Sequence, residues 1–291
     1  MAIRHLGQFG GSLAVVVAIA ACSPNASLTP EESISDAAAE NTAQKVVALT
    51  SMSADIVQNL DDDVLVGIPG SRLLTGDPRY EGIATVSSGR TEPDIEKIVA
   101  LEPDLVIGAV GFHDKTLERL TDLELDVLSV DIQGWESLQD ITQFLATRLD
   151  ADPTPLVQRY DACLAKAGNS EPTAIVLASR EPLLSPNKNS WAGDFLEKFN
   201  IQNLTADLQG QSEFQGYITL SPEKVLEMNP DQLLFVDSGG GVDDEIAQLK
   251  TDPFWGQLTA VQSDQVYGFN YHGLINPGSI QSIEQVCSAL G

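Results

Sequence analysis

The chain has 291 residues, enough for two domains of ordinary size that each bury a core. Its hydrophobic fraction of 43% and aromatic fraction of 6% are those of a globular protein and exclude disorder along the whole chain. With 42 acidic and 16 basic residues, the net charge is −26, which argues against binding to nucleic acid or to anionic lipid headgroups through charge. Adaptation for solubility would give the same net charge, so the charge says little about which ligand the protein binds.

The N-terminal segment has the pattern of a lipoprotein signal peptide. Leu13–Ala20 is an apolar run, shorter than the about 20 residues that a membrane-spanning helix needs and typical of a signal peptide. It leads into Ile19-Ala20-Ala21-Cys22, which is similar to a bacterial lipobox, in which the cysteine thiol receives the lipid. We therefore predict that residues 1–21 are removed and that lipid on Cys22 anchors the exported chain to a membrane, in the periplasm or on the outer face of the cytoplasmic membrane. An ordinary signal peptide followed by an incidental cysteine is the alternative.

Residues 22–44 lack aromatic side chains and hold few large aliphatic ones, so we expect a flexible tether. Beyond the tether, short apolar runs alternate with amphipathic stretches, a pattern that predicts mostly parallel sheets covered by helices. Strands are expected at 46–49, 64–68, 105–109, 127–130, 174–178, 232–236 and 265–269. Helices are expected at 53–60, 93–101, 114–122, 136–149, 191–199, 222–228, 243–249 and 278–290.

The alternation is interrupted near Pro153 and Pro155, where a proline-initiated helix is expected. We predict an α/β fold with two lobes, each a mostly parallel sheet covered by helices, joined by one long interlobe helix. The N-terminal lobe would cover 45–151, the helix 152–168 and the C-terminal lobe 169–291.

An internal repeat supports two related lobes. Residues Glu96–Ile107 match Glu223–Leu234: in both, Glu-Lys opens a helix, Pro-Asp ends it seven residues later, and a buried strand follows. Two copies are too few for a solenoid.

Motifs of common enzyme classes are absent: there is no Walker A loop, G-x-S-x-G elbow, C-x-x-C pair or H-E-x-x-H helix. Without His5 of the signal peptide, His113 and His272 are too few for a three-histidine zinc site, although two histidines with carboxylates could hold Mn²⁺ or Fe²⁺. Cys163 and Cys287 would lie in an oxidising compartment, and the sequence leaves open whether they form a disulfide.

The loops expected at the carboxyl ends of the strands, where open α/β sheets bind ligands, hold cations and aromatic side chains. Cations would pair with an anionic chelate, and aromatic faces would cover an apolar or planar ligand, although loops also collect such residues without binding anything. The candidate ligand-binding residues are Arg72, His113, Trp135, Arg180, Lys188, Trp191, Tyr217, Tyr271 and His272.

Several segments carry a family resemblance: Val47–Ile56, the two repeat segments, and Val266–Tyr267 with Asn276–Gly278 before a terminal helix. Through them, the chain from about Lys45 to the end resembles periplasmic binding proteins of ABC importers of the iron-siderophore, haem and cobalamin type. The resemblance implies two lobes linked by a helix and one exposed glutamate per lobe that docks on the permease. By position these are Glu96 and Glu223, although each could merely stabilise the N-terminus of its helix.

The resemblance implies a monomer without a resident cofactor that is not an enzyme. Such a protein binds an iron–siderophore chelate in the cleft between its lobes and hands it to the ABC permease. Cobalamin or haem would be taken in the same role, with Tyr271 or His272 as a candidate axial ligand of haem iron. Two alternatives of another class stay open: a chelatase-like α/β enzyme, which would need a histidine–carboxylate pair, and a carrier of bare Mn²⁺ or Fe²⁺.

Overall fold

The computed structural model describes residues 42–88, 91–209, 215–237 and 241–291. The predicted signal peptide, Cys22 and all but the last three residues of the predicted tether lie outside these ranges. In the part that is described, no helix is both long and apolar enough to cross a bilayer.

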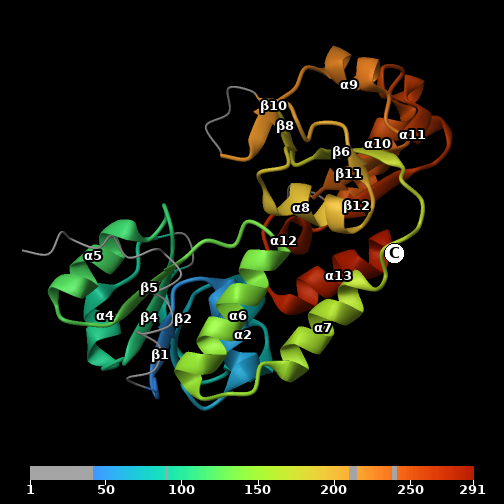
Figure 1. Cartoon of the computed structure of the whole chain (residues 1–291). Helices are drawn as coiled ribbons and strands as arrows, with labels where there is room; N and C mark the ends of the chain where they lie inside the picture. Colours follow the sequence, from blue (N-terminus) through green and yellow to red (C-terminus); the bar gives the residue numbers. More distant parts are fainter. Residues whose placement is uncertain (1–41, 89–90, 210–214, 238–240) are drawn as a thin grey trace, which may run out of the picture. The chain divides into compact units, whose positions relative to one another are not determined.

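The first sheet has five parallel strands in the order β3-β2-β1-β4-β5 (Figure 1). The strands are β1 (Val46–Ala48), β2 (Leu65–Pro69), β3 (Ala84–Ser87), β4 (Leu105–Ala109) and β5 (Val127–Val130). The chain adds β2 and β3 on one side of β1 and β4 and β5 on the other. The loops after β1 and β4 therefore diverge, and this pair forms the topological switch point of the sheet.

Helices cover both faces of the first sheet. One face packs against α2 and α6 through residues that include Val46, Ile56 and Leu145, and the other packs against α4 and α5 through Ile98 and Leu117. The helical segments around this sheet are α2 (Ser51–Leu60), α3 (Arg72–Thr75), η1 (Pro78–Tyr80), α4 (Ile95–Ala100), α5 (Asp114–Asp122) and α6 (Trp135–Leu149).

The second sheet has four parallel strands in the order β12-β11-β6-β9, with its switch point between β6 and β11. These strands are β6 (Thr173–Leu177), β9 (Gln202–Asn203), β11 (Gln232–Val236) and β12 (Val266–Phe269). A small antiparallel sheet lies beside it, with strands β7 (Ser179–Arg180), β8 (Leu183–Pro186) and β10 (Tyr217–Thr219). Around these sheets lie α8 (Trp191–Lys198), α9 (Pro222–Met228), α10 (Val242–Thr251), η2 (Trp255–Gln257) and α11 (Thr259–Gln262). The predicted α/β class with two parallel sheets is confirmed.

The internal repeat has the same local structure in both copies. Glu102 and Asn229 end α4 and α9 in the left-handed conformation, with φ of 49° and 43°, and a proline follows each. The next residue, Asp104 or Asp231, accepts backbone N–H bonds from the start of the neighbouring central strand: from Lys45 at 2.9 Å in the first sheet and from Thr173 at 2.9 Å in the second. The Pro-Asp pair of the repeat thus pins two parallel strands together in each sheet.

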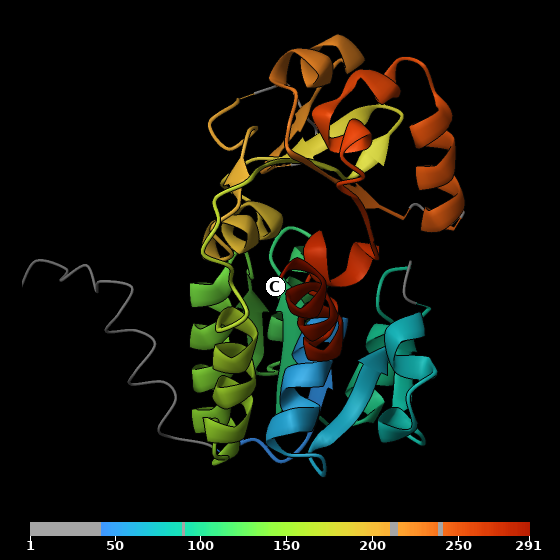
Figure 2. The ribbon, with the colours of Figure 1, turned by 90° about the vertical axis from the view of Figure 1, so that its right-hand side faces the viewer.

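The helix between the two sheets, α7 (Thr154–Leu164), lies inside the predicted range of 152–168 and has 11 residues. After β12, the chain runs through α12 (Tyr271–Leu274) into the terminal α13 (Ile280–Leu290). This last helix packs against α2 and α7 (Figure 2). The lobe boundaries at 151 and 169 stay predictions, and the packing of α13 is a reason to count 279–291 with the first lobe.

A disulfide joins Cys163 of α7 to Cys287 of α13, whose Cα atoms are 5.5 Å apart. The two cysteines are 124 residues apart in the sequence, so the bond closes a long loop and restricts the unfolded chain. It adds a covalent link to the packing of the C-terminal helix.

We expect the double substitution Cys163→Ser/Cys287→Ser to lower the free energy of unfolding by about 2–5 kcal/mol, because the unfolded chain regains the freedom of the closed loop. Urea denaturation followed by circular dichroism measures this. Wild-type protein in reducing buffer is the control and should unfold at the midpoint of the double variant. Equal midpoints for oxidised wild type and the variant would show that the bond contributes nothing.

Candidate functional site

The switch point of the first sheet lies between the loops that follow β1 and β4 at its carboxyl edge, the place where open parallel sheets bind ligands. Thr50 follows β1 and caps α2: its Oγ1 accepts the Ser53 N–H at 3.1 Å and donates to Ser53 Oγ at 2.7 Å. On the other side, residues 110–113 follow β4 and lead into α5.

The backbone of the loop after β4 is densely hydrogen-bonded. The backbone N–H of every residue from 109 to 113 donates a hydrogen bond, to Val130 O, Ala109 O (twice), Asp114 Oδ1 and His113 Nδ1 at 2.9–3.2 Å. Gly111 has a φ of 78°, which a residue with a side chain rarely adopts. This loop holds Val110 and Phe112 outward, with 50% and 90% of each residue exposed.

Phe112 was missed by the sequence reasoning, which selected the loop but only His113 within it. The available signal was a phenylalanine directly after a glycine at the end of a fully apolar strand. Such a position lies at the carboxyl edge of the sheet, where an apolar side chain cannot enter the core beneath.

His113 lies at the start of α5, half-buried, and burial lowers the pKa of its ring. Its Nδ1 accepts the Ala109 N–H at 3.0 Å, so the proton of the neutral ring is assigned to Nε2. The group left for further hydrogen bonding is therefore a donor, and the ring does not offer a free lone pair to a metal.

At the second switch point, the candidate cations are already paired. Arg180 forms an ion pair with Glu245 of α10, and its guanidinium lies 5.1 Å from the centre of the Phe235 ring. It lines a cavity of about 150 Å³ beneath α10. Lys188 is exposed and pairs with Asp207 at 2.7 Å. Each of these two cations is therefore paired with an acidic side chain.

Three of the candidate residues come together around the loop after β12. Tyr271 is exposed and meets the His272 ring edge to face, with the ring centres 5.4 Å apart. The Tyr217 hydroxyl donates to Ile275 O at 3.4 Å, and burial, with Tyr271 nearby, raises the pKa of Tyr217. Burial lowers the pKa of His272, and its ring packs so closely on Gly278 that a Cβ there would lie 2.5 Å from Nδ1.

The structure corrects the expectation for the two tryptophans. Trp135 and Trp191 are 1% and 3% exposed, and their ring centres lie 5.6 Å apart in a cluster with Phe195. The Trp191 indole donates to Gly273 O at 2.7 Å. Both residues begin helices, α6 and α8, and their rings pack into the core, so neither presents a face to a ligand.

Arg72 starts α3, after β2, and none of the ion pairs found among the described residues involves it. It lines a cavity of about 800 Å³ whose walls come from α2, the α3–η1 segment, α7 and α13. Three acids of the same wall, Asp55, Asp77 and Glu284, balance its three arginines in number.

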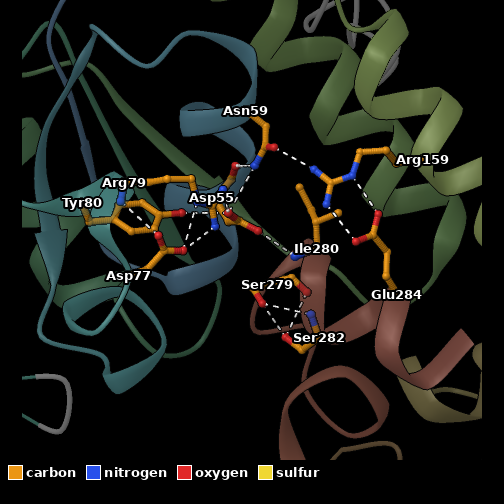
Figure 3. Close-up of polar contacts among 10 residues, drawn as sticks. All are labelled: Asp55, Asn59, Asp77, Arg79, Tyr80, Arg159, Ser279, Ile280, Ser282 and Glu284. Atoms are coloured by element: carbon orange, nitrogen blue, oxygen red, sulfur yellow. Dashed lines mark hydrogen bonds and ion pairs between the residues drawn. The ribbon is translucent and has the colours of Figure 1, made fainter. Parts of the chain in front are cut away.

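A buried carboxylate anchors the loops on either side of this cavity (Figure 3). Asp55 of α2, 1% exposed, accepts the Ile280 N–H at the start of α13 at 2.7 Å and the Tyr80 hydroxyl at 2.8 Å. Arg79 lies 3.1 Å from the same carboxylate and also pairs with Asp77 at 2.7 Å. These contacts fix the segment after β2 and the start of α13 on one helix.

A second polar link runs between α7 and α13. The Arg159 guanidinium donates to both oxygens of Glu284 at 2.7 and 2.9 Å and to Asn59 Oδ1 of α2 at 2.8 Å. A bidentate pair of this kind also fixes direction. Together with the bond from the Ile280 N–H to Asp55, it holds the first half of α13 against α2 and α7 (Figure 3).

The periplasmic binding protein family pattern matches residues 46–270. The chain belongs to this family. It is 25% identical over 205 residues to a vitamin B12-binding protein of Salmonella typhimurium, covering 68% of this chain and 73% of that one. It is 24% identical over 248 residues to an Fe(3+)-citrate-binding protein of Bacillus subtilis, covering 78% and 73%. The fold matches an ABC transporter substrate-binding protein of Listeria monocytogenes with a TM-score of 0.67 at 21% identity, over 85% of this chain and 96% of that one.

In this periplasmic binding protein, Glu96 and Glu223 lie at equivalent places. Each is exposed in the first turn of its helix, two residues after the N-capping side chain of Asp94 or Ser221. Hydrogen bonds from its own backbone N–H and from Ser221 lower the pKa of Glu223.

We expect Asp55→Ala to lower the free energy of unfolding by about 3 kcal/mol, because it leaves buried donors at Ile280 and Tyr80 and one face of Arg79 without their acceptor. Urea denaturation measures this. Asp62→Ala, an exposed acid just beyond the same helix, is the matched control and should stay within about 0.5 kcal/mol of wild type. Equal stability of the two variants would contradict the anchoring role of Asp55.

Proposed function

We propose that this chain is the substrate-binding component of an ABC importer and that it captures an iron–siderophore-type chelate at the carboxyl edges of its two sheets. The observation that carries the proposal is the exposed Phe112, held on a rigid loop at the switch point of the first sheet. The exposed Tyr271 adds aromatic surface near the carboxyl end of β12. Rigid aromatic surfaces of this kind suit a large ligand with an apolar or planar face.

The same arrangement could take cobalamin or haem. The vitamin B12-binding relative favours the first, and the exposed Tyr271 is a candidate ligand for haem iron. His272 is less suited to that role, because its ring packs against Gly278.

The two rivals from other classes have less support. A chelatase-like enzyme needs a histidine–carboxylate pair, and among the described residues neither His113 nor His272 hydrogen-bonds to a carboxylate. For a bare-metal carrier, the group of ligating side chains close enough to share an ion in the described part is Asp61–Asp63, which contains no histidine. Exposed acidic groups of this kind are common without an ion.

We further propose export and lipid attachment at Cys22. A Bacillus subtilis relative, 21% identical over 266 residues, is named an ABC transporter substrate-binding lipoprotein, which supports the anchor. The lipobox-like sequence ending at Cys22 is the other support.

Isothermal titration of the purified chain tests ligand capture. The probes are ferrioxamine B, ferric enterobactin, ferric citrate, cyanocobalamin, haemin and Mn²⁺. We expect one class of chelate to bind with a Kd below about 10 µM, a free energy of about −7 kcal/mol, and Mn²⁺ alone not to bind in this range. If no chelate reaches that affinity, the proposed function fails for these ligands.

We expect Glu96→Ala/Glu223→Ala to reduce chelate uptake by cells at least tenfold while the Kd stays within twofold of wild type. Both side chains are exposed, and two docking contacts, one in each repeat, would act together in recognition of a permease. Glu102→Ala/Glu227→Ala removes exposed glutamates near the other ends of the same helices and should leave uptake unchanged. Loss of chelate binding in the first double variant would refute the docking assignment.

A further inference from the structure

Phe112 is exposed because the backbone holds it there. An aromatic ring gains free energy by leaving water, so a mobile loop would fold such a ring onto the surface. Here all five N–H groups of residues 109–113 are bonded and Gly111 occupies a left-handed conformation, so the loop cannot easily rearrange. The ring and the neighbouring Val110 therefore form a fixed apolar surface, which we call the Phe112 knob.

The position of the Phe112 knob indicates what covers it. It follows β4, directly beside the loop after β1, at the switch point where open parallel sheets bind small ligands. Leu123, another exposed apolar residue, follows the last residue of α5 at the opposite end of that helix, 54% exposed and away from this edge.

Among the described residues, the charges around the two switch points sum to zero or are negative. After β4, Asp114 and Lys115 offset one another, and burial lowers the pKa of His113, which favours its uncharged ring. In the second sheet, Arg180 is paired with Glu245, and Asp243 and Asp244 lie in the first turn of α10 after β11. Arg72 lies after β2, in the cavity wall where acids match the arginines in number. In the described part of these loops, an anionic chelate would find no excess positive charge.

We propose that the Phe112 knob is the principal apolar contact of the ligand, and that the ligand is a neutral or positively charged metal chelate with a hydrocarbon or aromatic face. This rests on the proposed function and deepens it by naming the class of chelate. Trianionic catecholate chelates and anionic citrate chelates would be disfavoured.

The test is a titration of wild type, Phe112→Ala, Phe112→Leu and Leu123→Ala with four probes: positively charged ferrioxamine B, neutral cyanocobalamin, and negatively charged ferric enterobactin and ferric citrate. We expect one of the first two to bind at least tenfold tighter than the anionic pair. Phe112→Ala should raise its Kd by about tenfold or more, as expected for loss of a central aromatic contact, and Phe112→Leu by less. Leu123→Ala is the matched control and should stay within twofold.

A second readout uses Phe112→Trp, which places an exposed indole on the knob, whereas Trp135 and Trp191 are buried. Its long-wavelength emission should be quenched on binding, and that of Leu123→Trp should not. Tightest binding of an anionic chelate overturns the inference. So does binding that is unchanged in Phe112→Ala while uptake falls, which would assign the knob to the permease. Failure of every probe to bind wild type instead overturns the proposed function, and this inference with it.

Discussion

The buried carboxylate of Asp55 is the interaction on which the arrangement around the site depends. A charge removed from water is costly unless donors surround it, and Asp55 has four: the Ile280 N–H, the Tyr80 hydroxyl, Arg79 and the Asn59 amide. These donors come from three segments far apart in the sequence. Asp55 has all its donors only when α13 and η1 both lie against α2. This one side chain therefore fixes the segment after β2 and the segment after β12.

The same region explains what limits movement between the two sheets. The sequence suggested a single stiff helix, but the chain passes between the sheets twice, through the segment after α7 and again between β12 and α13. One apolar cluster is continuous from Val46 of the first sheet, through Phe195 of α8, to Val176 of the second. The disulfide and the Arg159–Glu284 pair tie α7 to α13, the two helices next to these crossings. Movement of the two sheets toward each other around a ligand would therefore be limited mainly by the packing where the chain crosses between them twice. The stiffness of α7 alone would matter less.

Buried parallel strands were predicted well because they are continuous apolar runs: the expected strands at 105–109 and 127–130 have the observed bounds. β3 was not predicted because half of its residues are exposed, and β9 because it has two residues. The two helix-initial tryptophans were misplaced because sequence position marks the loop but not the direction of the ring. Asp55 was not selected because its partner Ile280 is 225 residues away, a distance over which no local pattern acts.

One hydrogen bond, from the Ala109 N–H to His113 Nδ1, connects the rigidity of the β4–α5 loop with its chemistry. It completes the bonding of the backbone that holds Phe112 outward, and it assigns the ring proton of His113 to Nε2. The loop thus combines an apolar surface with an N–H donor, and it offers neither a metal ligand nor a positive charge. That combination suits a chelate that already encloses its metal and has hydrocarbon and oxygen acceptors on its surface. The protein then needs only to cover the hydrocarbon and to orient the chelate through a hydrogen bond. A bare metal ion would need the Nδ1 lone pair of His113, which already accepts the Ala109 N–H.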